Sequence, residues 1–558
     1  MGCGRRTIFS IAKIRFVGLK RLKDMSLGRA PRHEDLLRST RAACEARLPE
    51  RSIGRLLASE CHRLFPDEAF ADLFSDIGRW SVPPRIVAVV MVLQRIHGLS
   101  DREAVDAFAF DLRWKYAAGV LDFDHPSFAH TVLCDMRDRL RRSQQPNRIF
   151  DVVLQVAKDA GLIGRKRVLD STALYDAVAT QDTVTLIRAA IRALLKEARE
   201  ADGAFETQLR GVLRRDDDYR DAGKPVCDWD DQAARDALID ELARDGYALL
   251  AYLDGHKLAG PLLQAAQLLA TVLGQDLEQT DEGLFRIARR TVTDRVISTV
   301  DPEARHGHKT AARGFDGYKG HVALDPDSEL ITATEVTAGN AADGSVGTSL
   351  LREVLDEANA DRTEKVEVYG DSSYGTAKLV EHIEGAGAEA NVKVQGPSAP
   401  SGLFGKDAFR VDLNTDTVTC PAGRVVPIAR SKDGGGRASF AAYCADCPLR
   451  GKCTKSIEGR GIRVHPHEAT LQRSRERQRD PQWKARYRAT RPKVERKFGH
   501  LMLRRHGGRR ARMRGCARVG HDFALLAAAV SLKRLAVLCV STRLMVARSP
   551  DPSRQDAA

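Results

Sequence analysis

The sequence predicts a mixed α/β protein, in which two insertions interrupt an α/β core and an all-α domain precedes it. Three observations support this fold class. Short apolar segments typical of β-strands lead into Asp170 and Asp371. Amphipathic helical patterns fill most of residues 48–142 and 177–290. At 558 residues the chain is also too long for one hydrophobic core, so several domains are expected.

The composition is that of a globular protein with a polyanionic partner. Hydrophobic residues make up 43% of the chain and charged residues 29%, which argues against intrinsic disorder. The net charge of +14 favours nucleic acid as a partner. The apolar run at 523–540 is interrupted by Lys533 and Arg534, so no membrane span or membrane partner is expected. We therefore expect a cytoplasmic, nucleoid-associated protein with reduced cysteines.

The N-terminal third is expected to be helical. Residues 26–150 form the predicted helical domain, behind an N-terminal extension at 1–25. Ser100 and Glu103 have the spacing of a capping box at a helix start. Short helices separated by glycines such as Gly98 fit a helix-turn-helix-like DNA-binding module. A helical domain that serves only for packing fits the same pattern equally well.

The core is expected at residues 165–545. Its predicted elements are a strand ending at Asp170, a hairpin about the turn 325–328, a helix, and a strand ending at Asp371. A helix, a strand and the helix that carries Glu495 follow. This is the element order of a ribonuclease-H-like α/β core.

Two insertions are expected to interrupt this core. A long helical insertion covers residues 177–300, directly after the first strand. A cysteine-containing insertion covers residues 398–480 and separates the last strand from the glutamate helix. Residues 546–558 are expected to form a flexible tail.

Three acidic residues are the candidate site. Taken singly, Asp170 and Asp371 could each cap a turn, and Glu495 could pair with Arg491 four residues earlier. Taken together, two carboxylates at strand ends and one on a helix are typical of an oxygen cage for Mg²⁺ beside a polyanion. The element order and the basic chain favour the metal site.

The segment around Glu495 is strongly basic. Between Arg491 and Arg518 the chain has eleven Lys or Arg residues, and Glu495 is the single acid. A charge run of one sign favours contact with phosphates, and such binding weakens steeply with salt. The residues expected to contact DNA are Arg491, Lys493, Arg496, Lys497, Arg504, Arg505, Arg509 and Arg510.

Four of the eleven cysteines are close in sequence: Cys420, Cys444, Cys447 and Cys453. The CxxC pair, with Pro and Gly nearby, suits a tetrahedral Zn²⁺ site. The other two spacings are irregular for a zinc ribbon. Two interpretations stay open: a structural Zn²⁺ site, or reduced cysteines packed in a small β-rich insertion.

Several segments carry a family resemblance, among them VLDST, VTAGNAADG, VYGDSSYG, YCADCPLRGKCT and RPKVERKFGHL. In this order they resemble the DDE-type transposases of bacterial insertion sequences, in the branch with an InsH-like N-terminal domain. The resemblance implies that Asp170, Asp371 and Glu495 form the catalytic triad and hold two Mg²⁺ ions, with Mn²⁺ as a substitute. The chain departs from the family pattern at Tyr487 and Met502, and Pro492 predicts that Tyr487 lies on a separate helix.

The function implied by the resemblance is DNA transposition. Such an enzyme binds double-stranded DNA at terminal inverted repeats, cleaves phosphodiester bonds at the element ends and joins the 3′-hydroxyl ends to target DNA. It acts as a homo-oligomer, because two element ends must be brought together. The alternatives are another ribonuclease-H-like nuclease and a non-catalytic, zinc-containing DNA-binding protein.

Overall fold

The structure is a computed structural model of the chain. It describes residues 40–538 apart from 76–79, 121, 123, 179, 289–291, 311, 362 and 400–401. The expected N-terminal extension and C-terminal tail lie outside the described residues. The described part is mixed α/β, as expected from the sequence. None of its helices is long and apolar enough to cross a membrane.

In the described part of the chain, the segment ahead of the first strand is helical. Both hydrogen bonds of the expected capping box are present at Ser100 and Glu103. Gly98 ends the most deeply buried of these helices with a φ of 68°, and a Cβ atom there would lie 2.0 Å from the carbonyl oxygen of Arg505. This helix end therefore packs directly on the backbone of the basic segment. The helices are α1 (Thr40–Glu45), α2 (Ile53–Leu64), η1 (Asp67–Leu73), α3 (Pro84–His97), α4 (Asp101–Phe110), α5 (Leu112–Ala117), α6 (Thr131–Arg142) and α7 (Arg148–Asp159).

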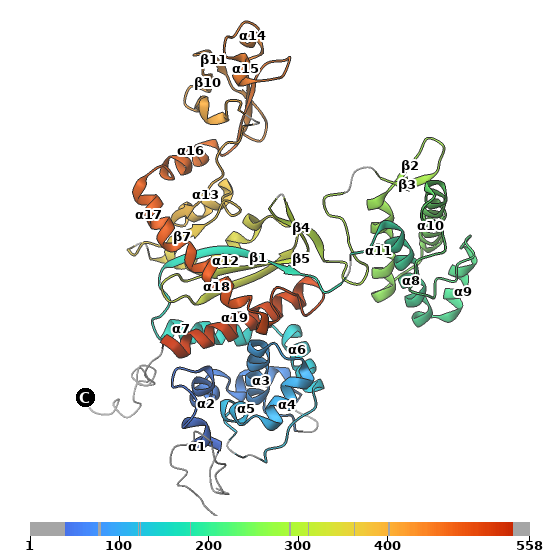
Figure 1. Ribbon diagram of the computed structural model, residues 1–558, viewed down its shortest axis with the longest axis vertical. Coiled ribbons are helices and arrows are strands. Elements are labelled where there is room, and N and C mark those ends of the chain that lie inside the picture. The colour runs from blue at the N-terminus through green and yellow to red at the C-terminus, as the bar shows by residue number, and fades with distance from the viewer. Residues whose placement is uncertain are drawn as a thin grey trace, which may run out of the picture.

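A six-stranded sheet forms the centre of the molecule (Figure 1). Strand β1 pairs with β5 antiparallel and with β7 parallel, and β8 extends the sheet parallel to β7. On the other side β5 pairs with β6 and, further along, with β4. The expected hairpin at 325–328 is confirmed between β5 and β6. The strands are β1 (Lys166–Tyr175), β4 (Arg305–Thr310), β5 (Arg313–Leu324), β6 (Ile331–Ala338), β7 (Glu367–Gly370) and β8 (Glu389–Val392).

Helices cover both faces of this sheet. Because side chains alternate along a strand, neighbouring residues of β1 enter different cores. Val168 packs in the core shared with the N-terminal helices, and Leu169 in the core beneath α12 and α13. The helices that pack on the sheet or follow it are α12 (Gly347–Ala360), α13 (Ala377–Gly385), α16 (Glu468–Arg477), α17 (Pro481–Thr490), α18 (Pro492–Leu501), η4 (Arg504–His506) and α19 (Cys516–Leu538).

The first strand is longer than the sequence predicted. It does not end at Asp170 but runs on to Tyr175, so Asp170 lies inside the strand. The reason is that the polar-looking segment after Asp170 pairs with β5, from Ser171 opposite His321 to Tyr175 opposite Gly317. Thr172 is only 2% exposed. Pairing and burial thus keep this segment in the sheet.

Between β1 and β4 the chain forms a separate helical lobe, which lies to one side of the sheet in Figure 1. It has a hydrophobic core of its own, built from its helices. A short hairpin closes it. Its elements are α8 (Thr183–Ala201), α9 (Gly203–Gly211), α10 (Gln232–Leu253), α11 (Gly260–Asp276), β2 (Leu277–Gln279) and β3 (Phe285–Ile287).

A second lobe, here called the cysteine lobe (residues 404–464), projects from the sheet at the top of Figure 1. It contains two three-stranded sheets of very short strands around its own small core. In the chain it separates β8 from α16, α17 and α18. Its elements are η3 (Lys406–Ala408), β9 (Arg410–Asp412), β10 (Thr417–Thr419), β11 (Val425–Pro427), β12 (Ala429–Arg430), β13 (Gly436–Ser439), α14 (Ala441–Cys444), α15 (Arg450–Cys453) and β14 (Gly461–Val464).

Candidate functional site

The fold brings the three acidic residues to one edge of the central sheet. The parallel pairing of β1 and β7 places Val168 opposite Tyr369. Asp170 and Asp371 each lie two residues beyond that pair, Asp170 inside β1 and Asp371 directly after β7. Glu495 lies in the first turn of α18, which contacts β1. Residues that are distant in sequence thus share one site.

The guanidinium of Arg491 lies between the three carboxylates. Its Nη2 atom is 3.0 Å from Oδ2 of Asp170 and 3.8 Å from Oδ2 of Asp371. Its Nη1 atom is 3.7 Å from Oε1 of Glu495. Nε and Nη1 are buried without a hydrogen-bond partner. One cation thus faces three anions, and it is incompletely hydrogen-bonded.

Burial and mutual repulsion disfavour the charged form of Asp170. Its side chain is 14% exposed, and burial is the main cause that raises its pKa to about 6. The nearby charge of Asp371 raises this pKa further, whereas the Arg491 guanidinium opposes the shift. A carboxylate whose ionisation is this unfavourable gains from an additional cation nearby.

A cavity of about 370 Å³ opens beside Asp170 and Asp371. A fourth carboxylate, Asp343, lies in its wall and is 8% exposed. Lys319 Nζ is 2.8 Å from Oδ1 of Asp343, and the Ser171 hydroxyl donates to Oδ2 at 2.6 Å. Sequence reasoning did not assign Asp343, although it lies in the VTAGNAADG segment. The cavity wall therefore combines carboxylate oxygens with two lysines, Lys309 and Lys319.

Tyr487 reaches the site from a separate helix, as the proline at position 492 predicted. Helix α17 ends at Thr490 and α18 begins at Pro492. The Tyr487 hydroxyl donates to the carbonyl oxygen of Gly370 at 3.1 Å, directly before Asp371. Its ring stacks on Trp483 at 4.9 Å. Tyr487 thus supports the backbone that positions Asp371, despite its irregular spacing.

The expected DNA-binding residues divide into two groups. Arg504, Arg505 and Arg510 are exposed on or just after η4, and they are available to a phosphate backbone. Lys497, in contrast, is 2% exposed, and burial lowers its pKa to about 8. A phosphate contact by Lys497 is therefore not supported, because its face of α18 packs into the core.

The remaining members of this set are partly engaged within the protein. Lys493 Nζ is 3.1 Å from Oδ1 of Asp327. Arg496 pairs with Glu329 but is 57% exposed. Arg509 is half-buried, and its carbonyl accepts a hydrogen bond from the Tyr175 amide. Lys493 and Arg496 thus already form ion pairs with carboxylates of the protein itself.

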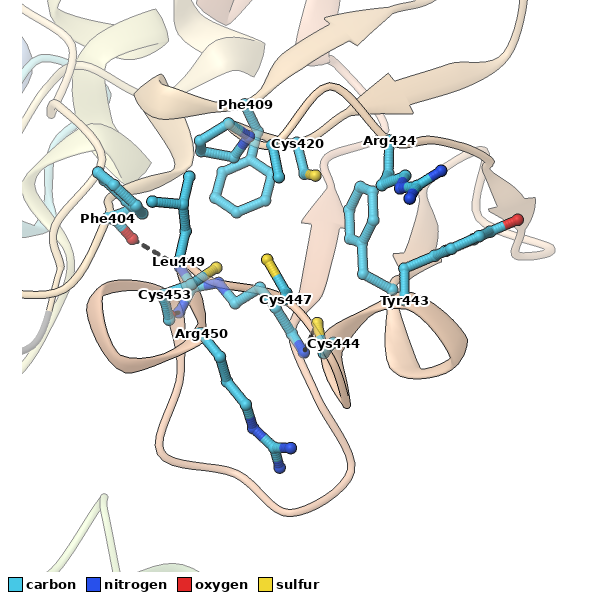
Figure 2. A pocket seen from close by; sticks show the side chains of 14 residues that line it. Phe404, Phe409, Cys420, Arg424, Tyr443, Cys444, Cys447, Leu449, Arg450 and Cys453 are labelled. Carbon is cyan, nitrogen blue, oxygen red and sulfur yellow. Dashed lines mark hydrogen bonds between the residues drawn. The ribbon is translucent and has the colours of Figure 1, made fainter.

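The four clustered cysteines line one small pocket of the cysteine lobe (Figure 2). Cys444 and Cys453 are buried, Cys420 and Cys447 are half-buried, and all four are free thiols. Burial is the main cause that raises the pKa of the Cys453 thiol, and its three cysteine neighbours raise it further. Among the residues that the structure describes, no three His, Cys, Asp or Glu side chains already stand in a metal-binding arrangement, here or at the carboxylates.

Comparison with known protein families gives two matches. Residues 419–536 match the family model of a transposase DDE domain, and residues 42–139 match that of a transposase domain of the DUF772 type. The first match includes Glu495 and the four cysteines, whereas Asp170 and Asp371 lie outside both. No curated protein and no solved structure matches the chain.

Proposed function

We propose that this chain, which belongs to the DDE-type insertion-sequence transposases by both family matches, cuts and joins DNA at the carboxylate site. It binds the terminal inverted repeats of its element, cleaves phosphodiester bonds at the element ends and transfers the 3′-hydroxyl ends to target DNA. The observation that carries this proposal is the convergence of Asp170, Asp371 and Glu495 around Arg491.

The strand order supports a ribonuclease-H-like core for this activity. From one edge the order is β6, β5, β1, β7 and β8, with β5 and β6 antiparallel and β7 parallel to β1. One carboxylate inside β1, one directly after the neighbouring strand β7 and a third on a later helix are then presented at one sheet edge. We assign residues 165–545 to this domain, of which the structure describes no residue beyond 538, and we take the helical and cysteine lobes as its insertions.

The residues of the site fit divalent cations. The triad and Asp343 together supply four carboxylates, with which Arg491 and Lys319 form ion pairs. Lys309 also lines the cavity. Carboxylate oxygens are the ligands that Mg²⁺ prefers, and Mn²⁺ is its usual substitute. Asp170, Asp371 and Glu495 would hold two such ions, which supply positive charge to the attacking and leaving oxygens of the phosphate.

The protein's own groups position the substrate. Lys319, held by Asp343, offers an ammonium group to a phosphate in the cavity. Arg491 reduces the repulsion between the carboxylates while no cation is bound, because its guanidinium lies within 4 Å of all three. Tyr487 fixes the backbone before Asp371. No histidine or serine is needed as a general base.

DNA is held outside the cavity by the basic segment and the N-terminal helices. The backbone of η4 at Arg505 packs against the end of α3 at Gly98, so the basic segment and the N-terminal helices adjoin. We assign the helical N-terminal domain, which contains the DUF772 match, to recognition of the terminal repeats. We expect at least two copies of the chain in the DNA complex, because two element ends must be brought together. Because the substrate is DNA, we expect the protein at the nucleoid.

Salt dependence of binding tests the DNA surface. Each phosphate contact contributes a slope of about −0.9 to the dependence of log K on log salt. The double variant Arg504→Ala/Arg505→Ala is expected to bind a terminal-repeat duplex more weakly. The magnitude of that slope should fall by about 1.8, which corresponds to the loss of two phosphate contacts. The measurement is fluorescence anisotropy from low to high salt. Lys497→Met is the matched control and should leave the slope unchanged, because Lys497 is buried. A reduced slope in this control would show that Lys497 contacts DNA after all.

The decisive assay for the function uses the full chain, Mg²⁺ and DNA that carries the element ends. Nicked ends together with products joined to a second DNA are expected. Nicks without joined products would favour a different ribonuclease-H-like nuclease. Specific binding without either product would favour a non-catalytic DNA-binding protein.

A further inference from the structure

The pocket of the cysteine lobe is built from sulfur and has room for one ion. Its volume is about 20 Å³, which suffices for a single water-sized species and excludes an organic ligand. Figure 2 shows the four sulfur atoms around one common space. They come from separate places in the lobe: Cys420 follows β10, Cys444 ends α14, Cys447 precedes α15 and Cys453 ends α15.

The backbone around the thiols is shaped to present them. The amide of Gly423, at a φ of 79°, donates to the Cys420 carbonyl at 2.9 Å and closes a tight turn there. The amide of Arg460 donates to Cys444 Sγ at 3.4 Å. Gly459 is required beside it, since a Cβ atom there would lie 3.1 Å from the Cβ atom of Cys444.

The chemistry of the pocket wall selects the ligand. Within the described residues, the wall contains no carboxylate and no imidazole, but three arginines, of which Arg460 and Arg424 are two. Hard, oxygen-seeking cations such as Mg²⁺ therefore have no ligand here. Four thiolates are the donor set of zinc, and positive charge nearby promotes the ionised thiol that binds metal.

Apart from a metal ion, the cysteine lobe has little to stabilise it. Its strands are two to four residues long, and its core contains only ten buried hydrophobic residues, two of which are Cys444 and Cys453. No disulfide joins its cysteines. Domains with so small a core usually depend on a disulfide or a structural metal.

We propose that Cys420, Cys444, Cys447 and Cys453 bind one structural Zn²⁺ ion and so hold the cysteine lobe together. In the structure as described, no three of these thiols stand in a metal-binding arrangement. Binding of the ion therefore requires the cysteine side chains to move toward one another. The site takes no part in the chemistry on DNA. Its role is to keep the two ends of the lobe in place, between β8 and the helices that lead to Glu495.

Metal analysis of the full-length protein tests this proposal. We expect about one Zn²⁺ per chain after purification without chelators. Cys447→Ser and Cys453→Ser are expected to lose most of this zinc. Cys227→Ser is the matched control, a half-buried thiol of the helical lobe, and should keep it. No zinc in the wild type, or equal zinc in all three variants, would overturn the assignment.

Cobalt substitution keeps the test informative should a serine variant fail to fold. Wild-type protein depleted of metal and titrated with Co²⁺ is expected to develop sulfur-to-cobalt charge-transfer absorption and the visible bands of tetrahedral Co²⁺, and both should bleach on addition of Zn²⁺. Absence of these bands means that the thiols are only packed side chains. Iron in place of zinc would refute the choice of metal. Neither readout depends on DNA cleavage, so failure here leaves the proposed function standing.

Discussion

Asp170→Asn, Asp371→Asn and Glu495→Gln are each expected to reduce DNA cleavage by about 10³-fold or more, because the three carboxylates act as one unit. Each amide keeps the size of the side chain but removes the negative charge that a divalent cation needs. Joining of pre-cleaved 3′-hydroxyl ends should fall equally, since both steps use the same site. The measurement is single-turnover cleavage and strand transfer in Mg²⁺.

Comparison of DNA-binding affinity with cleavage rate shows whether these variants lose catalysis or only lose binding. All three should bind a terminal-repeat duplex with nearly wild-type affinity, because the DNA outside the cavity is held by the exposed arginines on and after η4, and none of the three carboxylates is a proposed phosphate contact. Glu329→Gln is a matched control, a carboxylate that pairs with Arg496 away from the cavity. It should retain cleavage. Wild-type cleavage by all three triad variants would show that the carboxylates are not the catalytic site.

Much of the fold could be predicted from local sequence signals. The capping box at Ser100, the hairpin at 325–328 and the helix start at Pro492 are encoded within a few residues, and all three are present. Strand-like segments that precede Asp371 and Asp170 could be found in the same way. The position of Asp170 inside β1 could not, because the polar residues after it are held in the strand by a partner far along the chain.

The candidate site shows the same limit. Its acidic residues could be selected from element order and charge, but the central position of Arg491 depends on how α18 packs on the sheet. Asp343 was missed because it begins a short 3-10 helix, η2 (Asp343–Val346), among small residues with no ligand spacing around it. The burial of Lys497 was missed because a charge run does not reveal which face of its helix is covered.

The inactive Asp170→Asn variant is expected to be more stable than the wild type when no metal is bound. The folded protein raises the pKa of Asp170 from 3.8 to about 6. Between these values the folded state keeps a proton that the unfolded state has released, so stability falls as pH rises, and the loss is complete above about pH 6. The shift corresponds to about 3 kcal/mol at neutral pH, which the uncharged asparagine avoids.

The measurement is urea-dependent hydrogen exchange of β1 peptides in EDTA, which reports on this region of a multidomain chain. At pH 7.5 Asp170→Asn should protect β1 more strongly than the wild type, and near pH 4 the difference should vanish because Asp170 is protonated. Glu495→Gln is the control: its side chain is 67% exposed, so β1 protection should hardly change. Added Mg²⁺ should stabilise the wild type but not Asp170→Asn, since only the wild type retains the buried carboxylate. An Asp170→Asn protein less protected than the wild type at pH 7.5 would mean that Arg491 fully compensates the charge of Asp170. An additional cation would then not be required to stabilise the carboxylates.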